Sequence, residues 1–164
     1  MDLKKYIATV ENFPKEGVTF IDISPKLADK DDYKEIIDKM CGFIPEGTDY
    51  VVGPESRGYI FAAPVAIKKG IGFIPVRKKG KLPDDLVYSA EYEKEYGVDV
   101  ICLPKNDNYQ GKNFYVMDDV LATGGTLQAC KDLIKQAGGN YVGAGFYINI
   151  KALNNEEVDS VEEF

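Results

Sequence analysis

The clearest structural signal in the sequence is the segment Tyr115-Val116-Met117-Asp118-Asp119-Val120-Leu121-Ala122-Thr123-Gly124-Gly125-Thr126. Its apolar first part is typical of a buried strand ending at two adjacent aspartates, and a helical pattern begins after the second threonine. Gly124 and Gly125 permit a tight turn and a close approach of the backbone to a ligand. Because backbone amides at the start of a helix attract anions, we predict a phosphate site here, with Thr126 as the helix N-cap.

The two aspartates of this stretch predict a second kind of contact. Asp118 and Asp119 would repel a phosphate that they faced, so we expect them to face another group, such as vicinal hydroxyls of a sugar. The alternative is an ordinary strand, turn and capped helix. We favour the ligand site because both charges lie where a parallel strand is expected to end. The sequence has no Walker A loop, and Gly143-Ala144-Gly145 lacks the third glycine of a dinucleotide fingerprint.

Composition predicts one domain without a membrane span. The chain has 164 residues, 45% of them hydrophobic, and no apolar run approaches 18 residues. The start of the sequence has no signal-peptide core, so we expect a cytoplasmic protein. Cys41, Cys102 and Cys130 are widely spaced and are expected to be free thiols in or near the core. The sequence has no histidine, which leaves acid–base chemistry to carboxylates, Lys, Tyr, Cys or the substrate.

The charge is unevenly spread along the chain. The net charge is −7, yet residues 56–83 contain seven basic residues and no acidic one. An acidic chain with one basic segment favours a local polyanion site over general binding of nucleic acid. Lys68 and Lys69 are expected at the end of a helix, where cations favour the helix dipole. The other basic residues border glycine-rich or strand-end segments, and we expect ligand contacts from Arg57, Arg77, Lys78 and Lys81.

Hydrophobic periodicity predicts strands that alternate with helices. Helices are expected over 3–9, 33–43, 60–69 and 127–136, and strands over 18–23, 50–52, 72–76, 98–103, 114–117 and 141–150. The polar segment 79–96 could form a loose hairpin, and the acidic tail after Asn155 is expected to be solvated or frayed. This order predicts an α/β fold, with a mainly parallel sheet and helices on both faces. Ligands of such folds bind beyond the carboxyl ends of the strands.

Four segments, in the same order, carry a resemblance to a known family. The Asp118–Thr126 string resembles the phosphoribosyl-diphosphate motif of the type I phosphoribosyltransferases. The other segments are similar to the adenine phosphoribosyltransferases of that family: FPKEGVTFIDISP (13–25) to their N-terminal segment, VGPESRG (52–58) to their diphosphate loop, and RKKGKLP (77–83) with EKEYG (93–97) to the ends of their mobile loop. The resemblance implies one domain over 1–164, with an N-terminal hood over the base site (about 1–30) and a mobile catalytic loop (about 79–98).

The resemblance also implies a reaction. The phosphoribosyl group of phosphoribosyl diphosphate would pass to adenine, giving AMP and diphosphate in purine salvage. Amides of 122–126 would hold the sugar phosphate, and Asp118 and Asp119 the ribose hydroxyls. The diphosphate would meet the backbone of Glu55 and Ser56, where the family has an unusual peptide geometry. Side chains of Arg57, Arg77, Lys78 and Lys81 would add charge there, with Mg²⁺ carried mainly by the diphosphate and waters.

For the base, the resemblance implies that Phe20 and Val120 lie on opposite faces of the purine. Backbone groups near Thr19 and Ile21 would read the adenine edge; the family often has Arg or Lys where Ile21 stands, a change that a backbone contact tolerates. Glu95 in the mobile loop would act as general acid/base, the alternative being an ordinary surface glutamate. Tyr96 would pack in the same loop.

Two alternatives remain open at this point. The same chemistry could act on hypoxanthine, guanine or xanthine, although no lysine is an obvious donor to their oxo group. A non-catalytic regulator that senses phosphoribosyl diphosphate while binding DNA or RNA would need a further domain or a broad basic face, which the sequence lacks. We therefore expect an enzyme with small-molecule substrates that binds neither nucleic acid nor membranes, and the resemblance implies that it is a homodimer.

Overall fold

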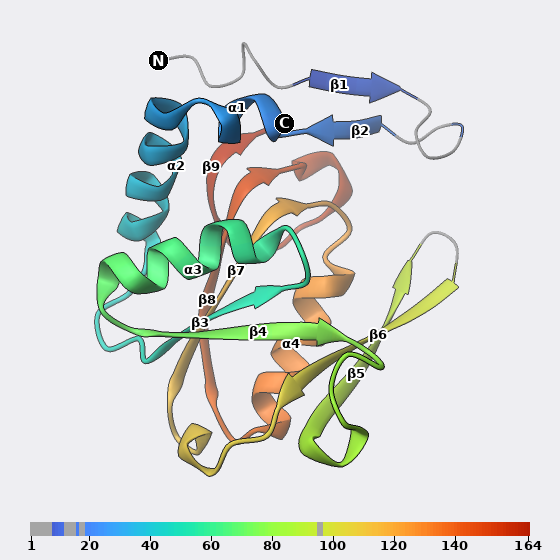
Figure 1. Cartoon of the computed structure of the whole chain (residues 1–164). Helices are drawn as coiled ribbons and strands as arrows, with labels where there is room; N and C mark the ends of the chain where they lie inside the picture. Colours follow the sequence, from blue (N-terminus) through green and yellow to red (C-terminus); the bar gives the residue numbers. More distant parts are fainter. Residues whose placement is uncertain (1–7, 12–15, 17–18, 95–96) are drawn as a thin grey trace.

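A seven-stranded sheet forms the centre of the molecule (Figure 1). The structure, a computed structural model, describes residues 8–11, 16, 19–94 and 97–164. The strand order is β5-β6-β4-β3-β7-β8-β9, with bounds β3 Tyr50–Pro54, β4 Gly72–Lys78, β5 Val87–Lys94, β6 Gly97–Pro104, β7 Asn113–Leu121, β8 Asn140–Asn149 and β9 Asp159–Glu163. Strands β4, β3, β7, β8 and β9 run parallel, while β6 is antiparallel to both β4 and β5. The predicted mainly parallel sheet is confirmed.

Helices cover both faces of this sheet, as predicted. Figure 1 shows α2 (Lys30–Phe43) and α3 (Gly58–Lys69) on one side and α4 (Gly125–Gln136) on the other. Each face has its own hydrophobic core, one built with α4 and the other with α2 and α3. Short helices complete the chain: α1 (Ser24–Ala28) and the 3-10 turns η2 (Asp84–Leu86), η3 (Asp107–Tyr109) and η4 (Lys151–Leu153). Within the described ranges, none of the helices combines the length and apolarity that crossing a membrane requires.

Strand β7 lies between the two cores, which explains its continuous apolar sequence. Phe114 and Val116 pack in the core under α4, while Tyr115 and Met117 pack in the core under α2 and α3. A strand buried on both faces reads as an apolar run rather than as an alternating pattern. The strand is longer than predicted, because it continues through both aspartates to Leu121.

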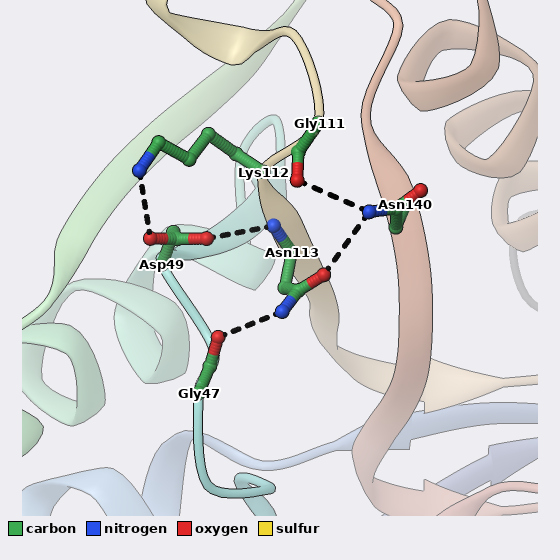
Figure 2. Close-up of polar contacts among 6 residues, drawn as sticks. All are labelled: Gly47, Asp49, Gly111, Lys112, Asn113 and Asn140. Carbon is green, nitrogen blue, oxygen red and sulfur yellow. Dashed lines mark hydrogen bonds and ion pairs between the residues drawn. The ribbon is translucent and has the colours of Figure 1, made fainter.

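The amino-terminal edge of the sheet is closed by a network of polar side chains (Figure 2). The Asp49 carboxylate accepts a hydrogen bond from the Asn113 backbone N–H at 2.8 Å and pairs with Lys112 at 3.4 Å. The Asn113 side chain donates to the Gly47 carbonyl at 2.9 Å and accepts from the Asn140 side chain at 3.2 Å. These bonds join the starts of β3, β7 and β8. We refer to this set (Gly47, Asp49, Gly111, Lys112, Asn113, Asn140) as the closed edge.

The tail is a strand, so the prediction of a frayed end is wrong. Residues 159–163 form β9, parallel to β8, and the Tyr115 hydroxyl of β7 donates to Asp159 at 2.7 Å. The tyrosine side chain passes over β8 where two glycines leave room: a Cβ on Gly143 would lie 2.9 Å from the ring, and one on Gly145 would lie 2.7 Å from the hydroxyl. These glycines are therefore needed for packing.

Two other predictions about elements need correction. A helix was expected over 3–9, of which the structure describes residues 8 and 9, and for these the prediction is wrong. They belong to strand β1 (Ala8–Glu11), which pairs antiparallel with β2 (Thr19–Asp22). The β1–β2 pair is a small sheet of its own, at the top of Figure 1. The segment expected as a loose hairpin is a well-paired one from Val87 onward, since every residue of β5 pairs with one of β6. The three cysteines are free, with Cys102 and Cys130 buried and Cys41 partly buried, as predicted.

Candidate active site

The loop after β3 leads directly into α3 at the carboxyl edge of the sheet. The peptide bond between Glu55 and Ser56 is cis, in agreement with the unusual geometry that the resemblance implied. Gly58 brings the start of α3 against the end of β7, because a Cβ there would lie 2.9 Å from Asp118 Oδ1 and 2.8 Å from Pro54 Cδ. A glycine is therefore required for this close approach.

The two aspartates at the end of β7 have different surroundings. Asp119 is buried and forms an ion pair with Arg57, with 2.7 Å between Oδ2 and Nε. Asp118 is partly buried and accepts the Asp119 backbone N–H at 2.9 Å. Burial, and then the neighbouring Asp119 charge, raise the pKa of Asp118 well above its ordinary value. Two carboxylates held side by side in this way are typical of a binding site.

Arg57 also links the β1–β2 sheet to the large sheet. Its guanidinium carbon lies 5.6 Å from the centroid of the Phe20 ring on β2, within the range of a cation–π contact. The side chain is 41% exposed. Arg57 thus stands between the residue predicted to stack on the base and the aspartate predicted to hold the ribose.

A second ion pair lies beside the first. Arg77 Nε donates to Glu55 Oε2 at 2.9 Å, and the Lys78 backbone N–H donates to the same oxygen at 3.1 Å. The hydrogen bond from Arg77, followed by that from Lys78, lowers the pKa of Glu55. The prediction assigned the backbone of Glu55 to a ligand; its carboxylate also holds one of the predicted ligand-binding cations.

The phosphate loop joins β7 to α4. Gly124, with φ +87°, is the N-cap of α4, so the prediction of Thr126 as N-cap is wrong. The left-handed conformation needed at this turn favours glycine over a side-chain cap. A Cβ on Gly125 would lie 3.1 Å from the Glu93 carbonyl, which shows how closely β5 approaches the start of this helix. The loop is also held by Asn154, whose side chain donates to the Ala122 carbonyl at 2.9 Å.

One pocket, of about 280 Å³, joins these parts. It is lined by Pro54, Glu55, Ser56, Arg57, Tyr92, Ile101, Asp118, Asp119 and Thr126. Six of these residues were predicted for the site, and they come from two segments far apart in the sequence, 52–58 and 118–126. Pro54, Tyr92 and Ile101 were not predicted. Tyr92 and Ile101 belong to the β5–β6 hairpin, which the motif at 93–97 had placed near the predicted site.

Comparison with known proteins agrees with this geometry. The family model described as "Phosphoribosyl transferase domain" matches residues 26–159. The adenine phosphoribosyltransferase of Streptococcus thermophilus is 48% identical over 158 residues, which are 96% of this chain and 91% of that protein. The chain belongs to the adenine phosphoribosyltransferase family. Two solved members share its fold. That of Thermoanaerobacter pseudethanolicus has a TM-score of 0.89 at 34% identity, covering 98% of this chain and 97% of the other. That of Saccharomyces cerevisiae, solved with adenine and an imino-altritol bisphosphate, has a TM-score of 0.85 at 37% identity, covering 92% and 88%.

The remaining residues predicted from the adenine phosphoribosyltransferase motifs lie around the pocket or outside the residues that the structure describes. Lys78, the last residue of β4, and Lys81, in the turn that follows, are both exposed. Ile21 and Val120 are partly buried against the core of α2 and α3. The backbone of Thr19 belongs to β2. Two predicted residues lie outside the described residues, Glu95 and Tyr96.

Proposed function

We propose that this chain transfers the phosphoribosyl group of phosphoribosyl diphosphate to adenine. The bond from the anomeric carbon to the diphosphate oxygen breaks, a bond from that carbon to a purine nitrogen forms, and the nitrogen's proton is released with diphosphate and AMP. The observation that carries the proposal is the shared pocket: the loop 54–57, the two aspartates and the start of α4 line one space. Membership of the family supports adenine as the acceptor.

The parts of the site suit the parts of this substrate. The amides at the start of α4 carry a partial positive charge and would bind the sugar's terminal phosphate. Asp118 and Asp119 would accept hydrogen bonds from the ribose hydroxyls. Arg57, Arg77, Lys78 and Lys81 would bind the diphosphate. Holding three parts of one ligand fixes its anomeric carbon, and such positioning is a large part of catalysis.

The pairs observed in the site imply that ligand binding rearranges them. Arg57 is paired with Asp119, and Arg77 with Glu55. A diphosphate would draw Arg57 away from Asp119, which frees that carboxylate to accept a ribose hydroxyl. Because the same ligand carries the diphosphate and the ribose, it would give Arg57 and Asp119 a new partner each. The buried Asp119 carboxylate would then not be left without a partner, a state that costs free energy.

We also propose Mg²⁺ as the cofactor, carried mainly by the diphosphate. Proteins bind this ion through one or two carboxylates together with substrate phosphates and waters. The adjacent carboxylates of Asp118 and Asp119 at the pocket fit that donor set. When bound, the ion would neutralise charge on the departing diphosphate. In the described part of the chain, no group of three or more His, Cys, Asp or Glu side chains is arranged to hold a metal.

For the base, we propose stacking between Phe20 and Val120, with adenine read by backbone groups near Thr19 and Ile21. Segment 1–30 would form a hood over the base, and segment 79–98 a mobile loop. Glu95 in that loop would act as general acid/base, a role worth about 10²–10⁴-fold in rate, and Tyr96 would help the loop to exclude water. We further propose a cytoplasmic homodimer.

One experiment tests the function. The purified protein is incubated with phosphoribosyl diphosphate and Mg²⁺ together with adenine, hypoxanthine, guanine or xanthine in separate reactions. We expect AMP from adenine and far less nucleotide from the oxopurines. Nucleotide formed from an oxopurine in preference to adenine would overturn the choice of base, and no nucleotide from any purine would overturn the reaction.

A further inference from the structure

We infer that Asn154 is a positioning residue for the phosphate loop. The inference rests on the proposed function, because the ligand that the loop would hold is the phosphate of phosphoribosyl diphosphate. Asn154 lies 32 residues beyond Ala122 in the sequence, and its side-chain amide donates to the Ala122 carbonyl at 2.9 Å. It lies in the segment between η4 and β9, which no sequence motif connects with the phosphate loop.

The partners of Asn154 fix the orientation of its side chain. The Nδ2 group also donates to the Ile150 carbonyl at 3.0 Å and to Asn149 Oδ1 at 3.1 Å, while Oδ1 accepts the Glu156 backbone N–H at 3.1 Å. The two N–H groups of Nδ2 serve three acceptors, so one of them is shared. A flipped amide would place its oxygen against the two carbonyl oxygens, so the observed orientation is the one that suits these groups. The side chain therefore joins the end of β8 to the phosphate loop as a rigid link.

This link determines where the loop's own donor points. The C=O and N–H groups of a trans peptide are planar and point in opposite directions. When Asn154 holds the Ala122 carbonyl, the N–H of Thr123 must point away from Asn154, on the side opposite the β8 end. A loop that offers its N–H groups to a phosphate needs its carbonyls held elsewhere in this way.

The carbonyls on either side of Ala122 are held differently. The Leu121 carbonyl accepts from the Ile150 backbone N–H at 2.9 Å, and the Gly124 carbonyl accepts from the Gln128 backbone N–H at 2.9 Å. Backbone bonds of this kind survive a change of side chain. The bond to Ala122 comes from a side chain, so substitution of Asn154 removes one anchor from the middle of the loop and leaves the flanking anchors in place.

The closed edge offers a matched control. The Asn140 side chain donates to the Gly111 carbonyl and to Asn113 Oδ1, both at 3.2 Å (Figure 2). Asn140→Ala therefore removes the same kind of side-chain amide from the opposite edge of the sheet, far along the strands from the proposed phosphate loop. Asn154→Asp is a second variant of the test residue, since it keeps the shape and the acceptor but has no N–H to give.

The test measures binding and catalysis separately. Calorimetry with phosphoribosyl diphosphate and Mg²⁺ gives the dissociation constant, steady-state kinetics give KM for each substrate, and thermal denaturation reports folding. We expect Asn154→Ala and Asn154→Asp to weaken phosphoribosyl-diphosphate binding and to raise its KM by about tenfold, as loss of an orienting bond does. The KM for adenine should stay within about twofold. Asn140→Ala should lower the melting temperature and leave both KM values within about twofold.

The possible failures are distinguishable. If the wild-type protein does not bind phosphoribosyl diphosphate, the proposed function fails and the inference fails with it. If the wild type binds and folded Asn154→Ala binds equally well, the inference fails alone. Equal losses of affinity in Asn154→Ala and Asn140→Ala would also overturn it, because the effect would then follow from stability and not from the loop.

Discussion

The two edges of the parallel sheet use the same residue types in opposite ways. At the closed edge, Asp49 pairs with Lys112 and accepts the Asn113 N–H, and these contacts, the Asn113 bond first, lower its pKa. At the carboxyl edge, Asp118 lies next to a second carboxylate, and burial and that neighbour raise its pKa. Since a backbone donor stabilises the charged form and a buried like charge destabilises it, the pKa shifts of the paired Asp49 and of Asp118, proposed to hold the ribose, have opposite directions.

The direction of the strands explains why the two edges differ. Helices α3 and α4 both begin at the carboxyl edge, directly after β3 and β7, and they bring the positive ends of their dipoles there. The amino-terminal edge has strand starts and turns, whose polar groups satisfy one another. An anionic ligand is therefore favoured at one edge only, and substitutions at the two edges should have effects of different kinds.

The largest effect is expected from Asp118→Asn combined with Asp119→Asn. The amides keep an acceptor but lose the charge assistance, and a hydrogen bond to a charged group is worth about 1.5–3 kcal/mol. We expect the affinity for phosphoribosyl diphosphate to fall by about 10²-fold or more, measured by calorimetry. An unchanged affinity would refute the ribose assignment and with it the contrast between the edges.

The corresponding change at the closed edge is Asn113→Ala, which should affect stability and not function. It removes the side-chain bonds to Gly47 and Asn140, leaving two polar groups without these partners. We expect the free energy of unfolding to fall by about 1–2 kcal/mol in urea denaturation, with kcat/KM within about twofold of wild type. A large loss of kcat/KM in the folded variant would mean that the closed edge also supports the site.

The sequence predicted the elements whose signal is local. The run from Tyr115 to Met117 marks the central strand, and the glycines and aspartates after it mark the site, because each of these features is contained in one short window. The loop at 52–58 was predicted for the same reason. These segments meet in one pocket because parallel strands bring their carboxyl ends to one edge.

The parts that sequence could not reveal depend on distant partners. Strand β9 is rich in acids and has little apolar signal of its own; its place depends on Tyr115, which reaches it across Gly143 and Gly145. Asn154 likewise acts on a loop 32 residues away. Helix α1 was not predicted either, although its start contains Pro25, which is a local signal for the first turn of a helix.

Asp118→Asn alone is expected to have a smaller effect on stability than Asn113→Ala, and to raise the stability where Asn113→Ala lowers it. The change removes a charge that burial and Asp119 disfavour, while an amide oxygen still accepts the Asp119 N–H. We expect a melting temperature a few degrees above wild type at neutral pH, together with weaker substrate binding. Such gains in stability at the expense of function are common at binding sites.

The pH dependence of this gain has a defined direction. As the pH rises above the ordinary aspartate value of 3.8, the unfolded wild type releases the proton first, so the wild type loses stability until the raised pKa of folded Asp118 is passed. The variant lacks this slope. The difference in melting temperature should therefore be small near about pH 4 and largest above the raised pKa. A difference that shrinks as the pH rises would contradict the assignment.

The smallest effect is expected from Glu55→Gln. Glu55 lies at the carboxyl edge, but it has a cation and a backbone N–H as partners, as Asp49 has at the closed edge. The Arg77 bond, followed by the Lys78 amide, lowers the pKa of Glu55 below its ordinary value of 4.5. Its contribution to stability is thus complete above about pH 4.5 and is lost as the pH falls through the lowered value. Because the pair is partly exposed, we expect the free energy of unfolding of the variant to be lower by only about 0.2–1 kcal/mol at neutral pH.

Urea denaturation of the wild type and Glu55→Gln from neutral pH to below pH 4.5 measures this difference. We expect the difference in the free energy of unfolding to disappear in acid. A difference that widens in acid would mean that the Glu55 carboxylate is destabilised, as that of Asp118 is, and would refute its stabilisation by Arg77 and the Lys78 N–H.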